Sequence, residues 1–226
     1  MSDKPIIFST PMIKALLAGL KTQTRRVHQV PDGLSHLAGS VSPRIKVGDR
    51  LWVRESFLPD PSADSDAWDD WTCSYVEWSG TGCKASQVPP ALRSARNVIY
   101  KADTKWDDVP LTFTSCRFMP RWASRVTLTV TDVRVQRLQD ISGQDAIAEG
   151  CVPAGWVTGK SAAEVDEIGR DAYANLWEQI NGLNTWAANP WVAAYTFTVA
   201  RGNIDSMPHA DGYSYTPLGR EDRGAG

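Results

Sequence analysis

The stretch MPRWASRVTLTVTDVRVQRL, residues 119–138, carries the clearest strand pattern in the chain. Apolar and polar residues alternate along it, as expected for a strand that buries one face. The candidate core positions are Val126, Leu128, Val130, Val133 and Val135. Val133 follows Val130 by three positions instead of two, and such a change of phase predicts a bulge or bend near Thr131-Asp132.

Outward from this stretch, the chain contains more strands than helices. The expected strands lie at residues 6–8, 22–27, 50–57, 97–103 and 191–199. The expected helices lie at residues 9–19, 142–150 and 164–181. Strands and helices do not alternate regularly, which argues against a doubly wound parallel sheet. We therefore expect an α+β fold built around a barrel-like sheet.

The first two helices have recognisable ends. Ser9 or Thr10 can cap the first helix, Pro11 suits its first turn, and Gly19 suits its left-handed stop. In the second helix, Ser142 and Asp145 form a capping-box pattern, and Gly150 ends the helix. Both helices are therefore short and sharply bounded.

Two segments lack any periodic pattern. Residues 59–96 are rich in Pro, Ser, Asp and Trp and are interpreted as an insertion or long loop within a single domain at residues 1–200. Residues 201–226 are rich in Gly, Pro and Asp, so we expect a flexible tail.

The composition is that of an ordinary globular protein with an uneven charge distribution. The net charge of the 226 residues is −2, which disfavours a protein that coats nucleic acid. Residues 1–60 nevertheless carry nine Lys or Arg against five Asp or Glu, and residues 117–137 carry five Arg against one Asp. These segments could hold an anionic ligand, or they could be strand edges balanced by acidic helices.

The four Cys and three His show no metal-binding spacing, so no metal or cofactor is expected. No signal sequence or membrane-length apolar run is present, and we expect a cytoplasmic protein without membrane contact. The sequence does not predict an oligomeric state. Of the ten Trp, Trp177 and Trp191 are expected in the core, and no role is assigned to Trp68, Trp71 and Trp78.

Four segments taken together resemble the ASCH superfamily, and in particular its longer members from bacteriophages and prophages. These segments are AGLKTQTRR (18–26), VGDRLWVRE (47–55), the stretch from Met119 to Gly150, and NPWVAAYTFTV (189–199). The resemblance implies a PUA-like β-barrel with flanking helices, a fold associated with recognition of RNA and modified bases. It also implies an activity, because small ASCH proteins include amidohydrolases that deacylate N4-acetylcytidine.

In those enzymes a Lys and a Thr of the G-x-K-T-x-T stretch act with a Glu on a later short helix. The matching residues of this chain are Lys21, Thr24 and Glu149. Arg26 matches the Arg two positions after that Thr. Arg25 stands where the small enzymes have an apolar residue. The chain is also about twice as long as those enzymes and has the Trp-rich insertion.

The proposed chemistry makes demands on each residue. The Thr24 hydroxyl needs a base, and Lys21 can act as that base only if burial and nearby Arg side chains lower its pKa. In a regular strand the side chains of residues 21 and 24 would face opposite ways, so Lys21 must lie in the turn after Gly19. Thr22 would share a face with Thr24 and is the reserve nucleophile.

Other residues have competing interpretations. Glu149 lies in the last turn of a helix, where a carboxylate is unfavourable, so we expect Lys21 to compensate it. Lys21 and Thr24 could also mark an exposed strand edge. Arg121, Trp122 and Arg125 could grip a nucleotide together with Arg25 and Arg26, or could simply pack at the start of a strand.

These observations predict an amidohydrolase that deacylates N4-acylated cytosine bases or nucleosides without a metal or cofactor. The small-molecule partner would be a modified cytosine nucleoside. Two alternatives use the same residues: a module that binds RNA or a modified base without turnover, and an RNA-cleaving protein in which Lys21 and the Arg side chains stabilise a phosphorane. Glu149 favours the enzyme, because a binding pocket has no need of a carboxylate.

Overall fold

A computed structural model describes residues 2–29, 40–60, 68–69, 74–75, 82–103 and 111–207. The strands and helices expected from the sequence are compared with the structure over those ranges. Trp71, Trp78 and residues 208–226 lie outside the described residues.

The main sheet has five strands in the order β1-β3-β8-β9-β2. Their bounds are β1 (Asp3–Ile7), β2 (Gln23–Val27), β3 (Arg50–Arg54), β8 (Val126–Arg137) and β9 (Trp191–Arg201). The pairing of β1 with β3 is parallel, and the other three pairings are antiparallel. Two small sheets pair β4 (Phe57–Pro59) with β7 (Val98–Tyr100) and β5 (Trp68–Asp69) with β6 (Ser74–Tyr75).

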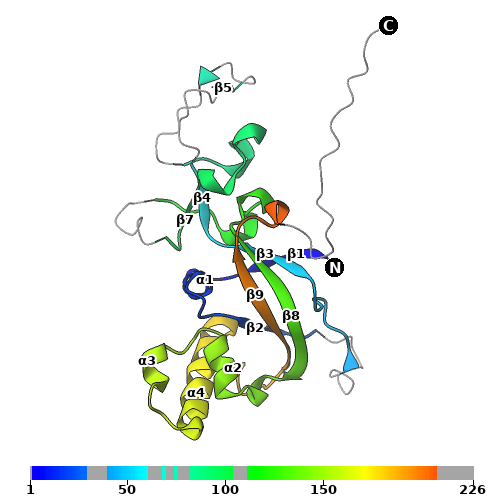
Figure 1. The fold of residues 1–226 in the computed structure, drawn as a ribbon, viewed down its shortest axis with the longest axis vertical. Coiled ribbons are helices and arrows are strands. Elements are labelled where there is room, and N and C mark those ends of the chain that lie inside the picture. Colours follow the sequence, from blue (N-terminus) through cyan, green and yellow to red (C-terminus); the bar gives the residue numbers. More distant parts are fainter. Residues whose placement is uncertain are drawn as a thin grey trace.

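The long strand forms as expected, with its bulge, but it is shorter than its sequence pattern. The register of β8 against β9 shifts between Val130 and Asp132, which confirms the predicted irregularity. Residues before Val126 instead form short 3-10 turns, at Cys116–Phe118 and Arg121–Ala123. Beyond the bulge, the β8–β9 ribbon continues towards the helices (Figure 1).

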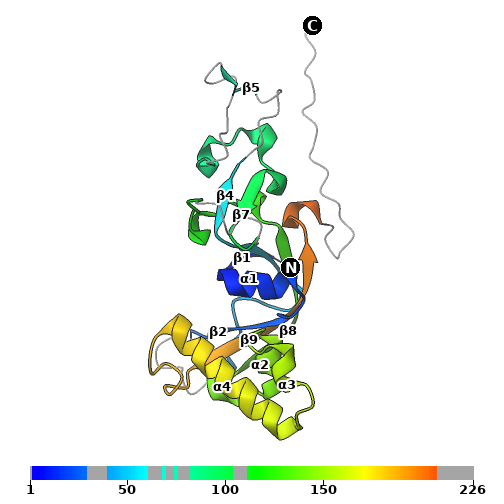
Figure 2. The same ribbon diagram turned by 90° about the vertical axis from the view of Figure 1, so that its left-hand side faces the viewer.

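The α+β class is confirmed, whereas the expected closed barrel is not formed. β1 and β2 are the two outer strands, and no strand pairing joins them among the described residues. The helix α1 (Thr10–Leu17) lies between them in both views (Figures 1 and 2). Its Ile13 and Leu16 are buried in the same cluster as Leu51 and Leu128. The helix thus covers the core where direct strand pairing would have closed the barrel.

Three further helices gather beside β2 at one end of the sheet (Figure 1). They are α2 (Gly143–Ala148), α3 (Ala154–Val157) and α4 (Ala162–Asn181). The sequence predicted α2 and α4, whereas α3 was not expected. Residues of α2, α4, β9 and the segment after β8 form a second core cluster. Its members are Leu138, Ile141, Ala146, Tyr173, Trp177 and Val192.

The described chain extends to Met207, six residues past the predicted start of the tail. β9 ends at Arg201, and Ile204–Ser206 forms a 3-10 turn in which Ile204 is buried. The Asn203 amide donates to the carbonyls of three residues, and the sequence pattern could not show these contacts. The acceptors are Arg121, Trp122 and Ser124.

Within the predicted insertion, the described residues include two strands that belong to the small sheets and three short 3-10 turns. The turns are Ala85–Gln87, Pro90–Leu92 and Ala95–Asn97. Val88, between the first two turns, is buried. No helix among the described residues is both long enough and apolar enough to cross a membrane.

Candidate active site

Lys21 lies in the turn between α1 and β2, as the sequence required. Gly19 has a positive φ of 72°, and the backbone amides of Leu20 and Lys21 both donate to the carbonyl of Ala15. The next amide, that of Thr22, donates to the carbonyl of Ala148 at 2.8 Å. The turn is thereby tied to the end of α1 and to the end of α2.

The Lys21 side chain is fully buried and its ammonium has three acceptors. Nζ lies 2.8 Å from the carbonyl oxygens of Gln23 and Glu149, and 2.8 Å from Glu149 Oε2. An ammonium has three hydrogens to donate, so each has an acceptor. Lys21 thus compensates both the carboxylate and the end of the helix, as predicted from the position of Glu149.

The space for this contact depends on Gly150. This residue follows Glu149, the C-cap of α2, and has a positive φ of 78°. A Cβ atom at Gly150 would lie 3.1 Å from the Cβ of Lys21 and 3.1 Å from that of Ala15. Glycine therefore allows both the left-handed turn and the close approach of Lys21 to the helix end.

Arg25 completes this buried cluster. Its Nη1 donates to Glu149 Oε1 at 3.0 Å and to Gln23 Oε1 at 2.7 Å, and its Nη2 donates to Asp145 Oδ2 at 2.7 Å. The side chain of Arg25 is buried and lies 5.7 Å from the ring of Tyr173. Lys21, Arg25, Asp145 and Glu149 are called the Lys21 cluster below. Its formal charges sum to zero.

The electrostatics of this cluster favour a less basic lysine. Burial lowers the pKa of Lys21 below its usual 10.5, against the opposing charge and hydrogen bond of Glu149. The positive charge of Arg26 lowers it further. Burial alone would raise the pKa of Asp145, but Arg134 and Arg25 lower it more, so this carboxylate stays ionised. The predicted direction for Lys21 is therefore present, with burial as its largest cause.

A cleft opens beside this cluster, between β2 and α4. Its wall contains Thr24, Arg25 and Glu149 together with Arg26 and apolar side chains. The apolar and aromatic residues are Met12, Val27, Tyr173, Leu176, Trp177 and Ile180. The cavity volume of the cleft is about 50 Å³. In this conformation the cleft can enclose a small group and not a whole nucleoside.

The two threonines differ in position. Thr24 is buried in β2 and lines the cleft, and its hydroxyl has no hydrogen-bond partner among the described residues. Thr22 precedes the strand, is exposed, and is not part of the cleft wall. Arg26 also lines the cleft. Its Nη2 donates to the carbonyl of Ile7 at 2.6 Å, and its guanidinium lies 5.2 Å from the ring of Phe8.

Arg121, Trp122 and Arg125, also predicted for the site, lie elsewhere. Thr24 faces Tyr195 on β9, whereas the carbonyl of Arg125 accepts a hydrogen bond from the amide of Gly202. Gly202, directly after β9, follows Tyr195 by seven residues of extended chain, which corresponds to about 23 Å. These three residues are therefore not brought together with Lys21 and Thr24.

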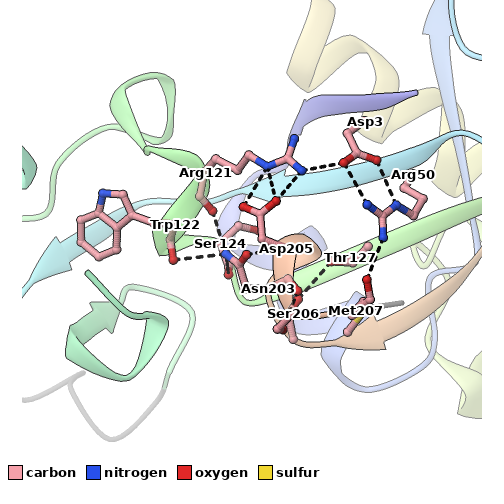
Figure 3. Close-up of polar contacts among 11 residues, drawn as sticks. Asp3, Arg50, Arg121, Trp122, Ser124, Thr127, Asn203, Asp205, Ser206 and Met207 are labelled. Atoms are coloured by element: carbon pink, nitrogen blue, oxygen red, sulfur yellow. Dashed lines mark hydrogen bonds and ion pairs between the residues drawn. The ribbon is translucent and has the colours of Figure 1, made fainter. Parts of the chain in front are cut away.

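The guanidinium groups of Arg121 and Arg125 already bind carboxylates of the protein. Arg121 binds Asp205 at 2.6 Å and also Asp3, which in turn binds Arg50 at 2.9 Å (Figure 3). These four residues are called the Arg121 cluster below. Arg125 binds Glu55 and Asp103 at 2.9 and 2.7 Å and lies over the ring of Tyr100. The interpretation as a packing arrangement at a strand entry fits these contacts.

The sequence did not predict four residues of the site. Gln23 and Asp145 position Arg25, and the rings of Tyr173 and Trp177 form part of the cleft wall. Asp145 was expected as a helix cap, but only the Ser142 half of that pattern forms. Tyr173 and Trp177 were visible only as apolar positions of α4. No group of three or more candidate metal ligands occurs in the described part of the chain.

Comparisons with known proteins add little to this geometry. No family model and no curated protein matches the chain. Among solved structures, the chain is similar to an ASCH domain from Lactobacillus crispatus JV V101, with 12% identity and a TM-score of 0.33. The alignment covers 88% of this chain and 79% of that one. At this TM-score and identity, the similarity carries no conclusion about the activity.

Proposed function

We propose that the cleft is the active site of an amidohydrolase that removes the acyl group from N4-acylated cytosine bases or nucleosides. The observation that carries this proposal is the position of Thr24. Its unpartnered hydroxyl lines the same cleft as Glu149, whose carboxylate holds a buried lysine of lowered pKa. These are the three residues that the resemblance to ASCH amidohydrolases singles out.

Each residue has a defined task in the proposed reaction. Thr24 Oγ1 attacks the acyl carbon, and neutral Lys21 accepts the proton that the hydroxyl loses. The C–N bond then breaks, and the cytosine N4 leaves as an amine after receiving a proton from Lys21 or through Glu149. Water hydrolyses the acyl-threonine ester in a second step and regenerates the hydroxyl. Neither step requires a metal ion.

One observation favours a second candidate, a module that binds a modified base or RNA without turnover. All three ammonium hydrogens of Lys21 have acceptors within the protein. To act as a base, Lys21 must give up one of these bonds, since a neutral amine has only two hydrogens. In the binding module, Lys21 would only hold Glu149 and the turn in place.

The deciding experiment is incubation of purified protein with N4-acetylcytidine, with cytidine release followed chromatographically. The enzyme predicts release that saturates with substrate and is lost in Thr24→Ala. The matched control is Thr22→Ala, which removes the same hydroxyl from an exposed position outside the cleft. Saturable binding without release of cytidine would support the binding module.

A short labelled RNA is incubated in parallel. Its cleavage, without deacylation of N4-acetylcytidine, would support the RNA-cleaving alternative.

A further inference from the structure

Two buried hydrogen-bond donors without acceptors belong to residues that line the cleft. Across the described residues, the buried side-chain nitrogens that lack a partner include Arg25 Nε and Trp177 Nε1. Both residues line the cleft, and both are nearly inaccessible, with exposed fractions of 3% and 4%. An unsatisfied buried donor costs about 1–3 kcal/mol, so a ligand that supplies acceptors gains by satisfying it.

The two donors restrict the chemistry of such a ligand. An indole N–H and a guanidinium N–H can only donate, so the ligand must present acceptors to both. The other two nitrogens of Arg25 are already bonded to carboxylates, as is Lys21, and the Lys21 cluster has no net formal charge. The rings of Tyr173 and Trp177 and the side chain of Leu176 supply apolar walls. These features suit a neutral, flat molecule with an acceptor edge.

We propose that Arg25 Nε and Trp177 Nε1 read the acceptor edge of a cytosine ring. Cytosine presents two adjacent acceptors, O2 and ring N3, and N4 acylation leaves both in place. Uracil presents an N–H at position 3 and would place a donor against a donor. The assignment of the ring as cytosine rests on the proposed function, whereas the need for two acceptors rests on the donors alone.

The site must widen to admit the ring, because its cavity volume is small. Ile180 and Asn181, at the end of α4, also line the cleft, and both are exposed. Displacement of these two side chains would widen the cleft without moving the buried Arg25 and Trp177. Recognition would then depend on Trp177 and Arg25, and access on Ile180 and Asn181.

Calorimetric binding of cytidine, uridine and 3-deazacytidine tests the ligand side. In 3-deazacytidine a C–H replaces ring N3, so one acceptor is lost while the shape is kept. We expect cytidine to bind about tenfold more tightly than either analogue, the usual scale for one buried hydrogen bond. Equal affinity for the three nucleosides would overturn the proposal, and no protein variant is needed for this measurement.

The protein side is tested with Trp177→Phe, which removes the N–H and retains an aromatic ring. We expect about tenfold weaker cytidine binding. The melting temperature should fall moderately, because the smaller ring leaves space in the second core cluster, although no hydrogen bond within the described structure is lost. Cytidine affinity equal to that of the wild type, in a folded Trp177→Phe variant, would overturn the role of Trp177.

Trp191→Phe is the matched control. Trp191 Nε1 is also buried without an acceptor, but its ring lies against Arg137, 4.6 Å from the guanidinium, and outside the cleft wall. We expect this variant to bind cytidine like the wild type, and an equal loss of affinity would contradict the assignment of the site to the cleft.

Failure of this proposal and failure of the proposed function give different results. Tight, N3-dependent cytidine binding without hydrolysis of N4-acetylcytidine would refute only the enzyme. Hydrolysis with the same KM in Trp177→Phe as in the wild type would refute only the assignment of Trp177.

Discussion

The Lys21 cluster and the Arg121 cluster lie towards opposite ends of the β8–β9 ribbon, and both combine two cations with two carboxylates. In the Arg121 cluster, the side chains of Arg121 and Asp205 are 37% and 58% exposed. Within the described structure, none of its side-chain atoms is both buried and without a partner. The Lys21 cluster is buried, adjoins a cleft, and includes the unpartnered Nε of Arg25.

The difference shows which features identify a candidate site. Charged residues lie close together in both clusters, so their presence does not distinguish a ligand site from a group of ion pairs that only stabilises the fold. The Arg121 cluster holds residues 203–207 against β1 and the turn at Arg121–Ala123. The cleft beside the Lys21 cluster is instead lined by three residues with unpartnered polar groups. These groups are the hydroxyl of Thr24 and the N–H groups of Arg25 Nε and Trp177 Nε1. Unsatisfied polar groups, rather than charge, separate the two regions.

The largest expected effect is the loss of the carboxylate in Glu149→Gln. Lys21 and Arg25 would remain buried without their shared counter-charge, and removing one partner of a buried ion pair costs about 3–5 kcal/mol. Asp205→Asn at the exposed cluster should cost about 1 kcal/mol or less. Urea unfolding of both variants measures the difference. Similar losses in the two variants would mean that burial does not distinguish the clusters.

Thr24 and Glu149 are both buried, whereas the sequence left open that Thr24 marks an exposed strand edge. The turnover of Glu149→Gln therefore has to be corrected for the fraction of folded protein in the same preparation.

Thr24→Ala should lower turnover by roughly 10²-fold while leaving stability nearly unchanged. The hydroxyl makes no hydrogen bond with the described residues, so its removal breaks no contact of the fold. Steady-state kinetics with N4-acetylcytidine and a melting curve measure the two quantities. If Thr22→Ala lost activity and Thr24→Ala did not, the nucleophile would be Thr22.

Activity should rise with pH, with a midpoint below 10.5. Burial lowers the pKa of Lys21, and only the neutral amine can accept the Thr24 proton, so kcat/KM falls about tenfold per pH unit below that pKa. The free energy of unfolding should also rise with pH. The pKa of Lys21 is higher in the unfolded chain than in the folded protein, so the unfolded chain binds more protons as the pH rises towards 10.5, and unfolding becomes less favourable. Lys21→Arg stays charged and should show no alkaline rise in activity.

Short acyl groups should be preferred. The cavity volume of the cleft is only about 50 Å³, so we expect N4-acetylcytidine to exceed N4-benzoylcytidine in kcat/KM by about tenfold or more. The competition of both substrates in one reaction measures the ratio directly. A preference for the benzoyl compound would show that the acyl group lies outside this cavity.

The smallest effect is expected from salt and from the Arg121 cluster. Arg121 and Arg125 are bound to carboxylates of the protein, and the net charge is −2, so a phosphate chain gains little there. KM for the nucleoside should change little between low and moderate salt, and Arg121→Ala should leave it unchanged. Tight RNA binding, with a salt slope equivalent to three or more contacts at about 0.7 each, would favour the binding module.

Local patterns predicted most elements of the fold. The spacing of α1 with Pro11 in its first turn and Gly19 at its stop, the long helix α4 and the bulge in β8 depend on residues close in the sequence, and all three are present. The expected side-chain cap of α1 is not formed, because Ser9 makes no cap hydrogen bond. The turn position of Lys21 followed from strand alternation and Gly19. The open sheet was not predicted, because the edge at which α1 packs depends on tertiary contacts and not on periodicity.

The candidate site was only partly predictable for the same reason. Lys21 contacts Glu149 across 128 residues of sequence, and only a resemblance to known proteins linked the two. Arg121 and Arg125 carried the same local signal as Arg25, namely a cation beside an aromatic or apolar strand. Their partners Asp3 and Glu55 lie 118 and 70 residues away, so the sequence pattern could not reveal that their charges are already paired.

The strand order also dictates when this site can exist. β2 is held in the main sheet through β9, the last strand in the described part of the chain, and Thr24 lies directly opposite Tyr195. A chain emerging from the ribosome has both Lys21 and Glu149 long before β9 is complete, but it lacks the strand that fixes β2 beside the helices. Such long-range pairing is slow to form. A fragment that ends before Trp191 should therefore contain every proposed catalytic residue and be inactive. Adding a peptide with the sequence of β9 should restore its activity.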